Sequence, residues 1–321
     1  MSKPTLHEKS VIPALSATSL WREPLEKSLQ EDQWQWDWTA MGALRSDPLR
    51  QVTARIVAKA DGVWAAEGLD IAVMQLAKWE GITLECRNRL RAGDFFSAGE
   101  EVTFWSGPAH ALLAFERSYL NLAAWTSGIA TQTSRLVNQV RETWSKLNEI
   151  QTRSPSGHTW SPPRVTSTRK TLPGYRDLSV RSVMAGGGMS HRVSLASGLL
   201  IKENHIAAAG GVGHAIRGVK EVAPHGLRIE IEVTSQEELQ EAIRCGVDAV
   251  LLDNFRPIEV RNALSWLHQQ PAGEKVCVEV SGGISGENLA NYIIPGVSVI
   301  SSGSLTHSVK ATDLSMLVDW K

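Results

Sequence analysis

Cysteine is scarce in this sequence, and long apolar runs are missing. Its 321 residues include three cysteines, Cys86, Cys245 and Cys277, which lie far apart and without CxxC spacing. This usage argues against a disulfide framework and against a zinc site. No apolar stretch reaches the roughly 20 residues that cross a bilayer, and the N-terminus, MSKPTLHEKSVIPALSATSLW, has no apolar leader. We therefore expect a cytoplasmic protein with no membrane partner.

An excess of charge of either sign is also missing. Lysine and arginine nearly balance aspartate and glutamate, which leaves a formal net charge of −1. Such a balance gives no overall attraction to nucleic acid, so we do not expect nucleic acid as a partner. Any binding site for an anion must instead be built locally from a few side chains. The length is sufficient for two domains.

Tyrosine and phenylalanine are few, whereas tryptophan is frequent, with 12 residues. Trp34, Trp36 and Trp38 stand unusually close together. We expect them to pack between domains, and a contact with a partner is the alternative.

The two halves of the sequence follow different patterns. Short mixed segments from Trp38 to about Ser106 predict a small α+β unit with antiparallel strands. A helical pattern follows from Ala109 to about Lys146. Strands then alternate with helices, which predicts a parallel sheet, open or closed into a barrel. The apolar strand segments are LRIEIEV, DAVLLDNF, KVCVEVSGG and VSVISSG.

Start and stop signals mark helices between these strands. Ser235 and Glu238 have the spacing of a capping box, and Gly246 lies where a helix ends. Ser285 is placed to cap a further helix through Leu289.

Basic residues gather after the first strands of the second half. Arg169 and Lys170 end the segment PPRVTSTRKT, three glycines precede His191 and Arg192, and Lys202 follows the next strand. A guanidinium binds a carboxylate or phosphate through two hydrogen bonds, whereas an ammonium acts as a mobile point charge. These five residues suit a substrate with several negative charges, such as a dicarboxylate together with phosphates. Solvated surface cations are the alternative.

Acidic residues occupy two later strands. Glu230 and Glu232 alternate with apolar residues and so lie on the same face, and Asp253 closes the run AVLL. A buried parallel strand has little reason to carry carboxylates inward unless they meet cations, hydroxyls or a metal. Glu232 and Asp253 could hold ribose hydroxyls and a Mg²⁺ ion that bridges pyrophosphate oxygens. Salt bridges to nearby lysines are the alternative.

Glycine and serine turns follow the last two strands, Ser281-Gly282-Gly283 and Ser302-Gly303-Ser304. Backbone N–H groups in such turns are a recurrent phosphate site.

An ordered set of segments resembles the quinolinate phosphoribosyltransferases, also called nicotinate-nucleotide pyrophosphorylases. The segments are ERSYLNLAAWTSGIAT, TRKTLPGYR, GGGMSHR, LIKENHI, EIEV, LLDNF, EVSGGI and ISSGSLTHS, with a weaker echo in EDQWQWDWT. The resemblance implies an N-terminal open-faced α/β sandwich and an incomplete, six-stranded α/β barrel of the type II phosphoribosyltransferases. We expect the sandwich and a bridging helix in residues 1–135, with 306–321 packing back on it, and the catalytic barrel in residues 136–305. It also implies a homodimer, or a higher oligomer, with sites shared between subunits.

The resemblance assigns roles motif by motif. The catalytic residues would be Lys170, near the pyrophosphate, and Glu232 and Asp253, at the ribose and at Mg²⁺, directly or through water. The quinolinate carboxylates would be bound by Arg169, His191, Arg192, Lys202 and, from the partner subunit, Arg117. The 5′-phosphate would be bound by Ser281, Gly282, Gly283, Ser302 and Gly303.

The implied reaction joins quinolinate to PRPP and needs no organic cofactor. The pyridine nitrogen attacks the anomeric carbon as pyrophosphate leaves, and a carboxylate such as Glu232 stabilises the developing cation. The quaternised ring then accepts electrons as the adjacent carboxylate leaves as carbon dioxide. The product would be nicotinate mononucleotide, in NAD biosynthesis.

Three family positions differ in this sequence. The usual lysine before the glycine triplet is missing from Val180-Arg181-Ser182-Val183. A family aspartate is Glu203, and the usual Gly-Asp-x-Thr is Trp36-Asp37-Trp38-Thr39.

Other functions stay open at this point. A paralogue found with molybdate-transport systems shares the motifs, and a nicotinate phosphoribosyltransferase would need fewer cations. A barrel aldolase could form a Schiff base at Lys170 or Lys202. A scaffold protein without activity would not need so many buried charges.

Overall fold

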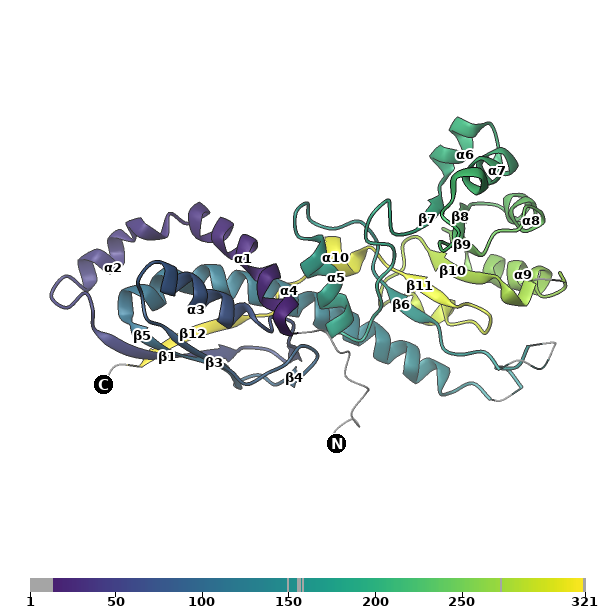
Figure 1. Cartoon of the computed structure of the whole chain (residues 1–321). Helices are drawn as coiled ribbons and strands as arrows, with labels where there is room; N and C mark the ends of the chain where they lie inside the picture. Colours follow the sequence, from purple (N-terminus) through teal and green to yellow (C-terminus); the bar gives the residue numbers. More distant parts are fainter. Residues whose placement is uncertain (1–13, 149, 155–156, 158, 272, 320–321) are drawn as a thin grey trace. The chain divides into compact units, whose positions relative to one another are not determined.

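The computed structural model describes residues 14–148, 150–154, 157, 159–271 and 273–319. The chain divides into two compact units, one formed by residues 1–128 and 311–321 and the other by residues 129–310 (Figure 1). Each unit is described here by itself.

The first unit is built on an antiparallel sheet with strand order β12-β1-β5-β3. Figure 1 shows α1, α3 and α4 on the same side of this sheet. Its strands are β1 (Gln51–Ala58), β3 (Glu85–Asn88), β5 (Glu101–Pro108) and β12 (Leu314–Asp319), and β2 (Gly62–Val63) pairs separately with β4 (Phe95–Phe96). Its helices are α1 (Ala14–Glu31), a 3₁₀ turn (Trp34–Trp36), α2 (Trp38–Ala43), α3 (Leu69–Trp79) and the start of α4 (Ala109–Trp144).

Large aromatic side chains fill the core of the first unit. Trp64, Trp105, Phe115 and Tyr119 are fully buried. The rings of Trp105 and Tyr119 meet edge to face at 4.9 Å between centroids. The Tyr119 hydroxyl shares a 3.1 Å hydrogen bond with Thr103, which satisfies both polar groups inside the core.

The second unit contains a six-stranded, wholly parallel sheet with strand order β6-β11-β10-β9-β8-β7. Because β6 and β7 are its two edges, the sheet is an incomplete barrel. The strands are β6 (Arg164–Thr166), β7 (Leu199–Ile201), β8 (Ile229–Val233), β9 (Ala249–Asp253), β10 (Cys277–Ser281) and β11 (Val299–Ser301). The helices are α5 (Arg176–Ala185), α6 (Glu203–Ala209), α7 (Val212–Val222), α8 (Gln236–Arg244), α9 (Pro257–Leu267) and α10 (Ser304–His307), with 3₁₀ turns at Gly273–Lys275 and Leu289–Tyr292. The expected fold class, an antiparallel sandwich with an incomplete parallel barrel, is confirmed.

The helix signals read from the sequence had two outcomes. Ser235 accepts a hydrogen bond from the Glu238 N–H at the start of α8, and Gly246 follows the helix with a φ of +71°, as predicted. The helix predicted from Ser285 through Leu289 is wrong. The Asn288 side chain instead accepts from the Ser285 N–H and donates to the Gly283 carbonyl, and this local bonding closes a turn that competes with a helix.

The tryptophan cluster is only partly packed. Trp34 contacts the ring of Phe115, but Trp36 and Trp38 stack on one another with 61% and 72% of their surfaces exposed. The two residues stand on either side of Asp37, which caps α2 by accepting from the Ala40 N–H. The expectation that they pack between domains stays a prediction.

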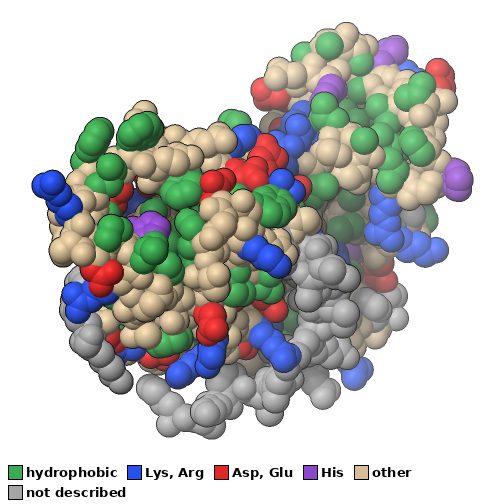
Figure 2. Space-filling view, turned by 60° about the vertical axis from the view of Figure 1, so that its left-hand side comes forward, with side chains coloured by type: hydrophobic (Ala, Val, Ile, Leu, Met, Phe, Trp, Pro, Cys, Tyr) green, Lys and Arg blue, Asp and Glu red, His purple; other side chains and the backbone are tan. Residues whose placement is uncertain are grey.

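Acidic and basic side chains are interspersed over the face that Figure 2 shows, as the small net charge predicts. Within the described residues, no helix combines the length and the apolar character needed to cross a bilayer.

Candidate active site

The predicted site residues of the second unit follow the carboxyl ends of its strands. Because all six strands are parallel, these ends meet at one edge of the sheet. Lys170 comes shortly after β6, Lys202 directly follows β7, Glu232 lies on β8, and Asp253 ends β9. Ser281 ends β10 and is paired in register with Asp253.

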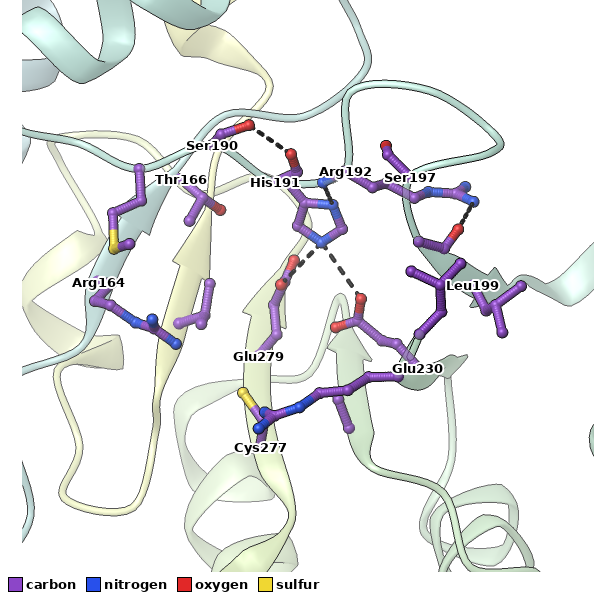
Figure 3. Close-up of a pocket in the computed structure, with 16 residues that line it drawn as sticks. Arg164, Thr166, Ser190, His191, Arg192, Ser197, Leu199, Glu230, Cys277 and Glu279 are labelled. Carbon is purple, nitrogen blue, oxygen red and sulfur yellow. Dashed lines mark hydrogen bonds and ion pairs between the residues drawn. The ribbon is translucent and has the colours of Figure 1, made fainter. Parts of the chain in front are cut away.

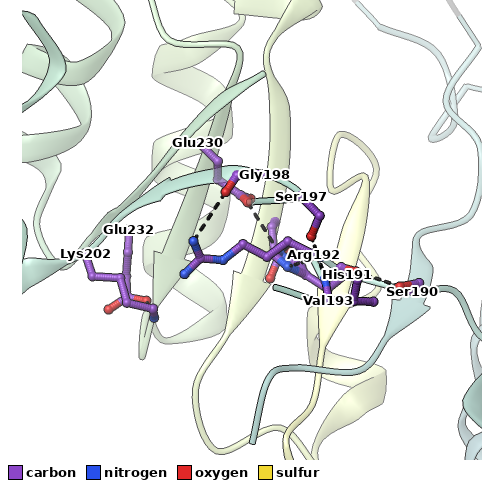
Figure 4. A network of polar contacts seen from close by, with 10 residues as sticks. Ser190, His191, Arg192, Val193, Ser197, Gly198, Lys202, Glu230 and Glu232 are labelled. Atoms are coloured by element: carbon purple, nitrogen blue, oxygen red, sulfur yellow. Dashed lines mark hydrogen bonds and ion pairs between the residues drawn. The ribbon is translucent and has the colours of Figure 1, made fainter. Parts of the chain in front are cut away.

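Lys202 and Glu232 form an ion pair across neighbouring strands (Figure 4). The Glu232 side chain is 12% exposed, whereas Lys202 is 43% exposed. The Glu232 side chain is thus turned inward, as the strand pattern predicts, and its partner is a lysine, which is the salt-bridge alternative. Its expected role at the ribose and at Mg²⁺ stays a prediction. The backbone N–H of Lys202 donates to His205 Nδ1 at 2.9 Å, which holds the lysine at the start of α6.

Asp253 lies within the electrostatic reach of the same pair. Burial raises the pKa of Asp253 above its ordinary value, and the nearby charge of Glu232 raises it further. The cations of Lys202 and Lys170 act in the opposite direction. Two carboxylates and two ammonium groups thus share one small region, where an added cation would relieve the repulsion between the carboxylates.

A tight turn supports Asp253. Asn254 donates a 2.7 Å hydrogen bond from Nδ2 to the Asp253 carboxylate, and its backbone N–H donates to the Ser281 carbonyl at 2.9 Å. Asn254 has a φ of +57° and Gly282 a φ of +95°. A Cβ atom on Gly282 would lie 2.3 Å from Asn254 Oδ1. The glycine is therefore required for the turn that orients Asp253.

Gly282→Ala is expected to destabilise the protein by roughly 2 kcal/mol or more, since the added methyl group collides with Asn254 in a left-handed backbone. Gly283→Ala is the matched control, because Gly283 has a φ of +58° with no atom within 4 Å of an added Cβ. It should cost only about 1 kcal/mol. Denaturant unfolding measures both values, and equal losses would contradict the collision.

The last turn of the barrel is bonded to the loop that carries Lys170. The Ser302 hydroxyl contacts Ser304 Oγ and donates to the Ile284 carbonyl, at 2.8 and 2.6 Å. Thr306 donates from Oγ1 to the Lys170 carbonyl at 2.8 Å, and a Cβ on Gly303 would lie 3.2 Å from the Lys170 stem. The hydroxyl of Ser302 is thus engaged within the protein, and Gly303 lies beside Lys170.

Several buried polar atoms of the barrel interior have no hydrogen-bond partner among the described residues. They are Thr166 Oγ1, Arg169 Nε, Glu279 Oε1 and Ser301 Oγ. Thr166 on β6 is paired in register with Ser301 on β11, and Arg169 follows β6. Buried polar groups are rarely left unpaired, so this region is suited to a polar ligand.

His191 is held deeper, between two carboxylates at the middle of the sheet (Figure 3). Its Nε2 lies 3.2 Å from Glu279 Oε2 and 3.4 Å from Glu230 Oε2. Burial alone lowers the pKa of His191, but the hydrogen bonds and charges of Glu230 and Glu279 outweigh it and raise this pKa. The Arg192 N–H donates to His191 Nδ1 at 2.8 Å, and this bond opposes a second proton on the ring, because it favours the form whose proton lies on Nε2, toward the carboxylates.

Arg192 extends from the same loop toward Gly198, whose carbonyl accepts from its guanidinium at 3.4 Å. Burial and the charge of Arg169 lower the pKa of Arg192, while Glu230 and Glu232 oppose this. The two guanidinium groups are therefore near enough to repel one another. A bound dianion would relieve that repulsion.

A cavity of about 270 Å³ lies below His191, on its side toward the amino ends of the strands (Figure 3). It is lined by the first residues of five strands, Arg164, Leu199, Ala249, Cys277 and Val299, and by His191, Arg192, Glu230 and Glu279. His191 thus separates this cavity from the strand ends that carry Lys170 and Asp253.

Not every predicted residue joins this arrangement. Arg117 is exposed on α4 and belongs to the first unit, whereas the residues described above belong to the second. Conversely, the sequence pattern predicted only that Glu230 faces inward, and it predicted no role for Glu279. A signal for Glu279 was present, because it stands between Val278 and Val280 as Glu230 stands between two isoleucines.

Comparisons with known proteins cover nearly the whole chain. Models of the quinolinate phosphoribosyl transferase N-terminal and C-terminal domains match residues 38–127 and 129–317. A probable carboxylating nicotinate-nucleotide pyrophosphorylase of Bacillus subtilis is 39% identical over 82% of each chain, and one of Archaeoglobus fulgidus is 35% identical over 86% of this chain and 98% of its own. The solved nicotinate-nucleotide pyrophosphorylase of Francisella tularensis is 29% identical, with a TM-score of 0.78 over 98% of this chain and 100% of its own. This chain therefore belongs to the quinolinate phosphoribosyl transferase family.

Proposed function

We propose that this protein is a carboxylating nicotinate-nucleotide pyrophosphorylase, which converts quinolinate and PRPP into nicotinate mononucleotide, pyrophosphate and carbon dioxide. The observation that carries the proposal is the arrangement at the carboxyl edge of the parallel sheet. There Glu232 and Asp253 face Lys202 and Lys170, with Arg169 nearby after β6. The names of its relatives in bacteria, archaea and human agree with this activity.

The charges of the site divide between the two substrates. The guanidinium groups of Arg169 and Arg192 repel one another and are suited to the two carboxylates of quinolinate. Lys202 is paired with Glu232, and we assign it to the point where quinolinate meets the ribose of PRPP. Holding both reactants in one geometry supplies the orientation that a bimolecular reaction otherwise lacks.

Glu232 is the residue that we assign to the anomeric carbon. A carboxylate turned inward and shielded from solvent stabilises the positive charge that develops as pyrophosphate leaves. Asp253 is assigned to the ribose hydroxyls, and Lys170 to the departing pyrophosphate. The turns at Ser281–Gly283 and at Ser302 and Gly303 are assigned to the 5′-phosphate, through their backbone.

Mg²⁺ fits the same two carboxylates. Burial raises the pKa of Asp253 and the charge of Glu232 raises it further. Oxygen ligands of this kind suit Mg²⁺, which binds one or two carboxylates together with substrate phosphates. When bound, the ion would neutralise charge on the pyrophosphate. We include Mg²⁺, a homodimer and a cytoplasmic location in the proposal as the expectations drawn from the sequence.

The proposal is tested with purified protein, Mg²⁺ and PRPP, with quinolinate and nicotinate supplied in parallel. Nicotinate mononucleotide from quinolinate alone supports it, whereas product from nicotinate alone contradicts it. A protein that binds PRPP but uses neither substrate would instead be the molybdate-associated paralogue. Borohydride trapping of a substrate on Lys170 or Lys202 would identify an aldolase.

We further propose that Arg117 of one subunit completes the site of its partner. Arg117→Ala and Glu232→Gln should each be nearly inactive alone. When the two are mixed and reassembled, activity should return to roughly a quarter of the wild-type value, because half of the dimers are mixed and each has one intact site. A mixture no more active than the average of its components would contradict shared sites.

A further inference from the structure

Two buried carboxylates from different strands converge on a single ring nitrogen. Glu230 comes from β8 and Glu279 from β10, and both reach His191 Nε2, from 3.4 and 3.2 Å (Figure 3). The Glu279 side chain is only 3% exposed. Neither carboxylate belongs to the group assigned to PRPP, which lies nearer the carboxyl ends of the strands.

Packing alone does not account for this pair of carboxylates. A buried carboxylate is costly unless it is paired, and an apolar residue at either position would fill the barrel interior at lower cost. Glu279 also leaves its Oε1 buried without a hydrogen-bond partner among the described residues. A buried carboxylate kept only for stability would have hydrogen bonds to both oxygens. The role of Glu279 therefore lies in its contact with His191.

His191 in turn holds the loop that carries Arg192. The Arg192 N–H donates to His191 Nδ1 at 2.8 Å, while Nε2 faces the two carboxylates. Both ring nitrogens are thus engaged within the protein. The orientation of the ring instead fixes where the backbone of Arg192 begins.

The remainder of this loop is closed by short local bonds (Figure 4). Ser197 Oγ accepts from the N–H groups of Val193 and Ser194, both at 3.0 Å, and the Gly198 carbonyl accepts from the Arg192 guanidinium. The loop therefore depends on His191 at its start and on Ser197 at its end. If the His191 ring lost its orientation, the hydrogen bond from the Arg192 N–H to Nδ1 would be lost and this end of the loop would become mobile.

We propose that Glu279 and Glu230 are positioning residues, which orient the His191 ring so that its Nδ1 fixes the Arg192 loop for binding of the aromatic dicarboxylate. The inference rests on the proposed function for the identity of that ligand. It makes His191 a link between the barrel interior and Arg192.

Glu279→Ala is expected to raise the KM for quinolinate about tenfold, with kcat changed by less than about threefold and the KM for PRPP unchanged. Glu279→Gln keeps an oxygen that accepts from Nε2–H, so it should restore most of the loss. Glu241→Gln is the control, since Glu241 is a half-buried carboxylate that accepts from the Gly213 N–H on α7, away from the site.

Two further measurements separate positioning from a general loss of structure. Amide hydrogen exchange in residues 190–198 should be about tenfold faster in Glu279→Ala and unchanged in Glu241→Gln. In addition, Glu279→Ala should add little to the effect of Arg192→Ala on the KM for quinolinate, because both act on the same contact.

Unchanged exchange and an unchanged KM for quinolinate in Glu279→Ala would overturn the inference, as would a Glu279→Gln variant no better than Glu279→Ala. If Glu279→Ala does not fold, Glu230→Ala is measured in the same way. Faster exchange in a protein whose wild type does not use quinolinate would leave the positioning role intact and reject the proposed function.

Discussion

Glu232→Gln is expected to lower kcat about 100-fold or more while the KM for quinolinate changes less than about threefold. Glu232 is turned inward from β8 and is 12% exposed, so its charge acts in surroundings that screen it poorly. Removing one such preorganised charge from a developing cation costs a factor of about 10² to 10³ in turnover. The amide has the same shape, so the change isolates the charge.

The effect on quinolinate should be small because the amide oxygen of glutamine can still accept a hydrogen bond from Lys202 and keep this lysine in place. Steady-state kinetics with each substrate varied in turn measure both parameters, with Glu241→Gln as a control carboxylate outside the site. A raised KM for quinolinate with kcat preserved would move Glu232 away from the ribose and reject its assigned role.

Arg192→Ala is expected to raise the KM for quinolinate about 100-fold, with a smaller change in kcat. A guanidinium forms two charge-assisted hydrogen bonds to a carboxylate, each worth roughly 1.5–3 kcal/mol. Burial lowers the pKa of Arg192, and repulsion from Arg169 lowers it further. A bound carboxylate would relieve this repulsion.

Arg192→Lys provides the matched comparison. It keeps the charge but loses the planar fork, so its KM should fall between those of the wild type and Arg192→Ala. Calorimetric titration with quinolinate in the absence of PRPP measures affinity without turnover. The affinity should fall from the wild type to Arg192→Lys and then to Arg192→Ala. Unchanged kinetics in Arg192→Ala would remove this residue from the substrate site.

Much of the second unit follows from regular patterns in the sequence. Apolar runs of strand length separated by capped helices predict a parallel sheet, and the alternation of Glu230 and Glu232 with isoleucines predicts that both face inward. The structure shows what the alternation could not: Glu230 pairs with His191 and Glu232 with Lys202. Partners that are distant in sequence depend on strand order and register, which no local pattern specifies.

Local signals failed where another local interaction was stronger. Ser285 has the spacing of a helix cap, but the Asn288 side chain bonds to the backbone and closes a turn. Trp36 and Trp38 look like core residues by composition, yet both are exposed on either side of Asp37, which caps α2. The pattern did not single out Glu279, because one carboxylate between two valines also occurs in strands where it has no function.

Two departures from the family pattern have simple structural explanations. Val180 lies on the buried side of α5 with 8% of its surface exposed, where an apolar side chain packs well. Glu203 is the exposed first residue of α6, and a negative charge there is favoured by the helix dipole, whether it comes from aspartate or glutamate.

The most direct test of the proposed function follows the carbon that is lost. Quinolinate labelled with ¹³C in the carboxyl group beside the ring nitrogen would be supplied with PRPP and Mg²⁺, and labelled carbon dioxide and nucleotide would be counted together. We predict one labelled carbon dioxide for each nicotinate mononucleotide, and neither product without PRPP. A nucleotide that keeps both carboxyl groups, or carbon dioxide released without PRPP, would contradict the account.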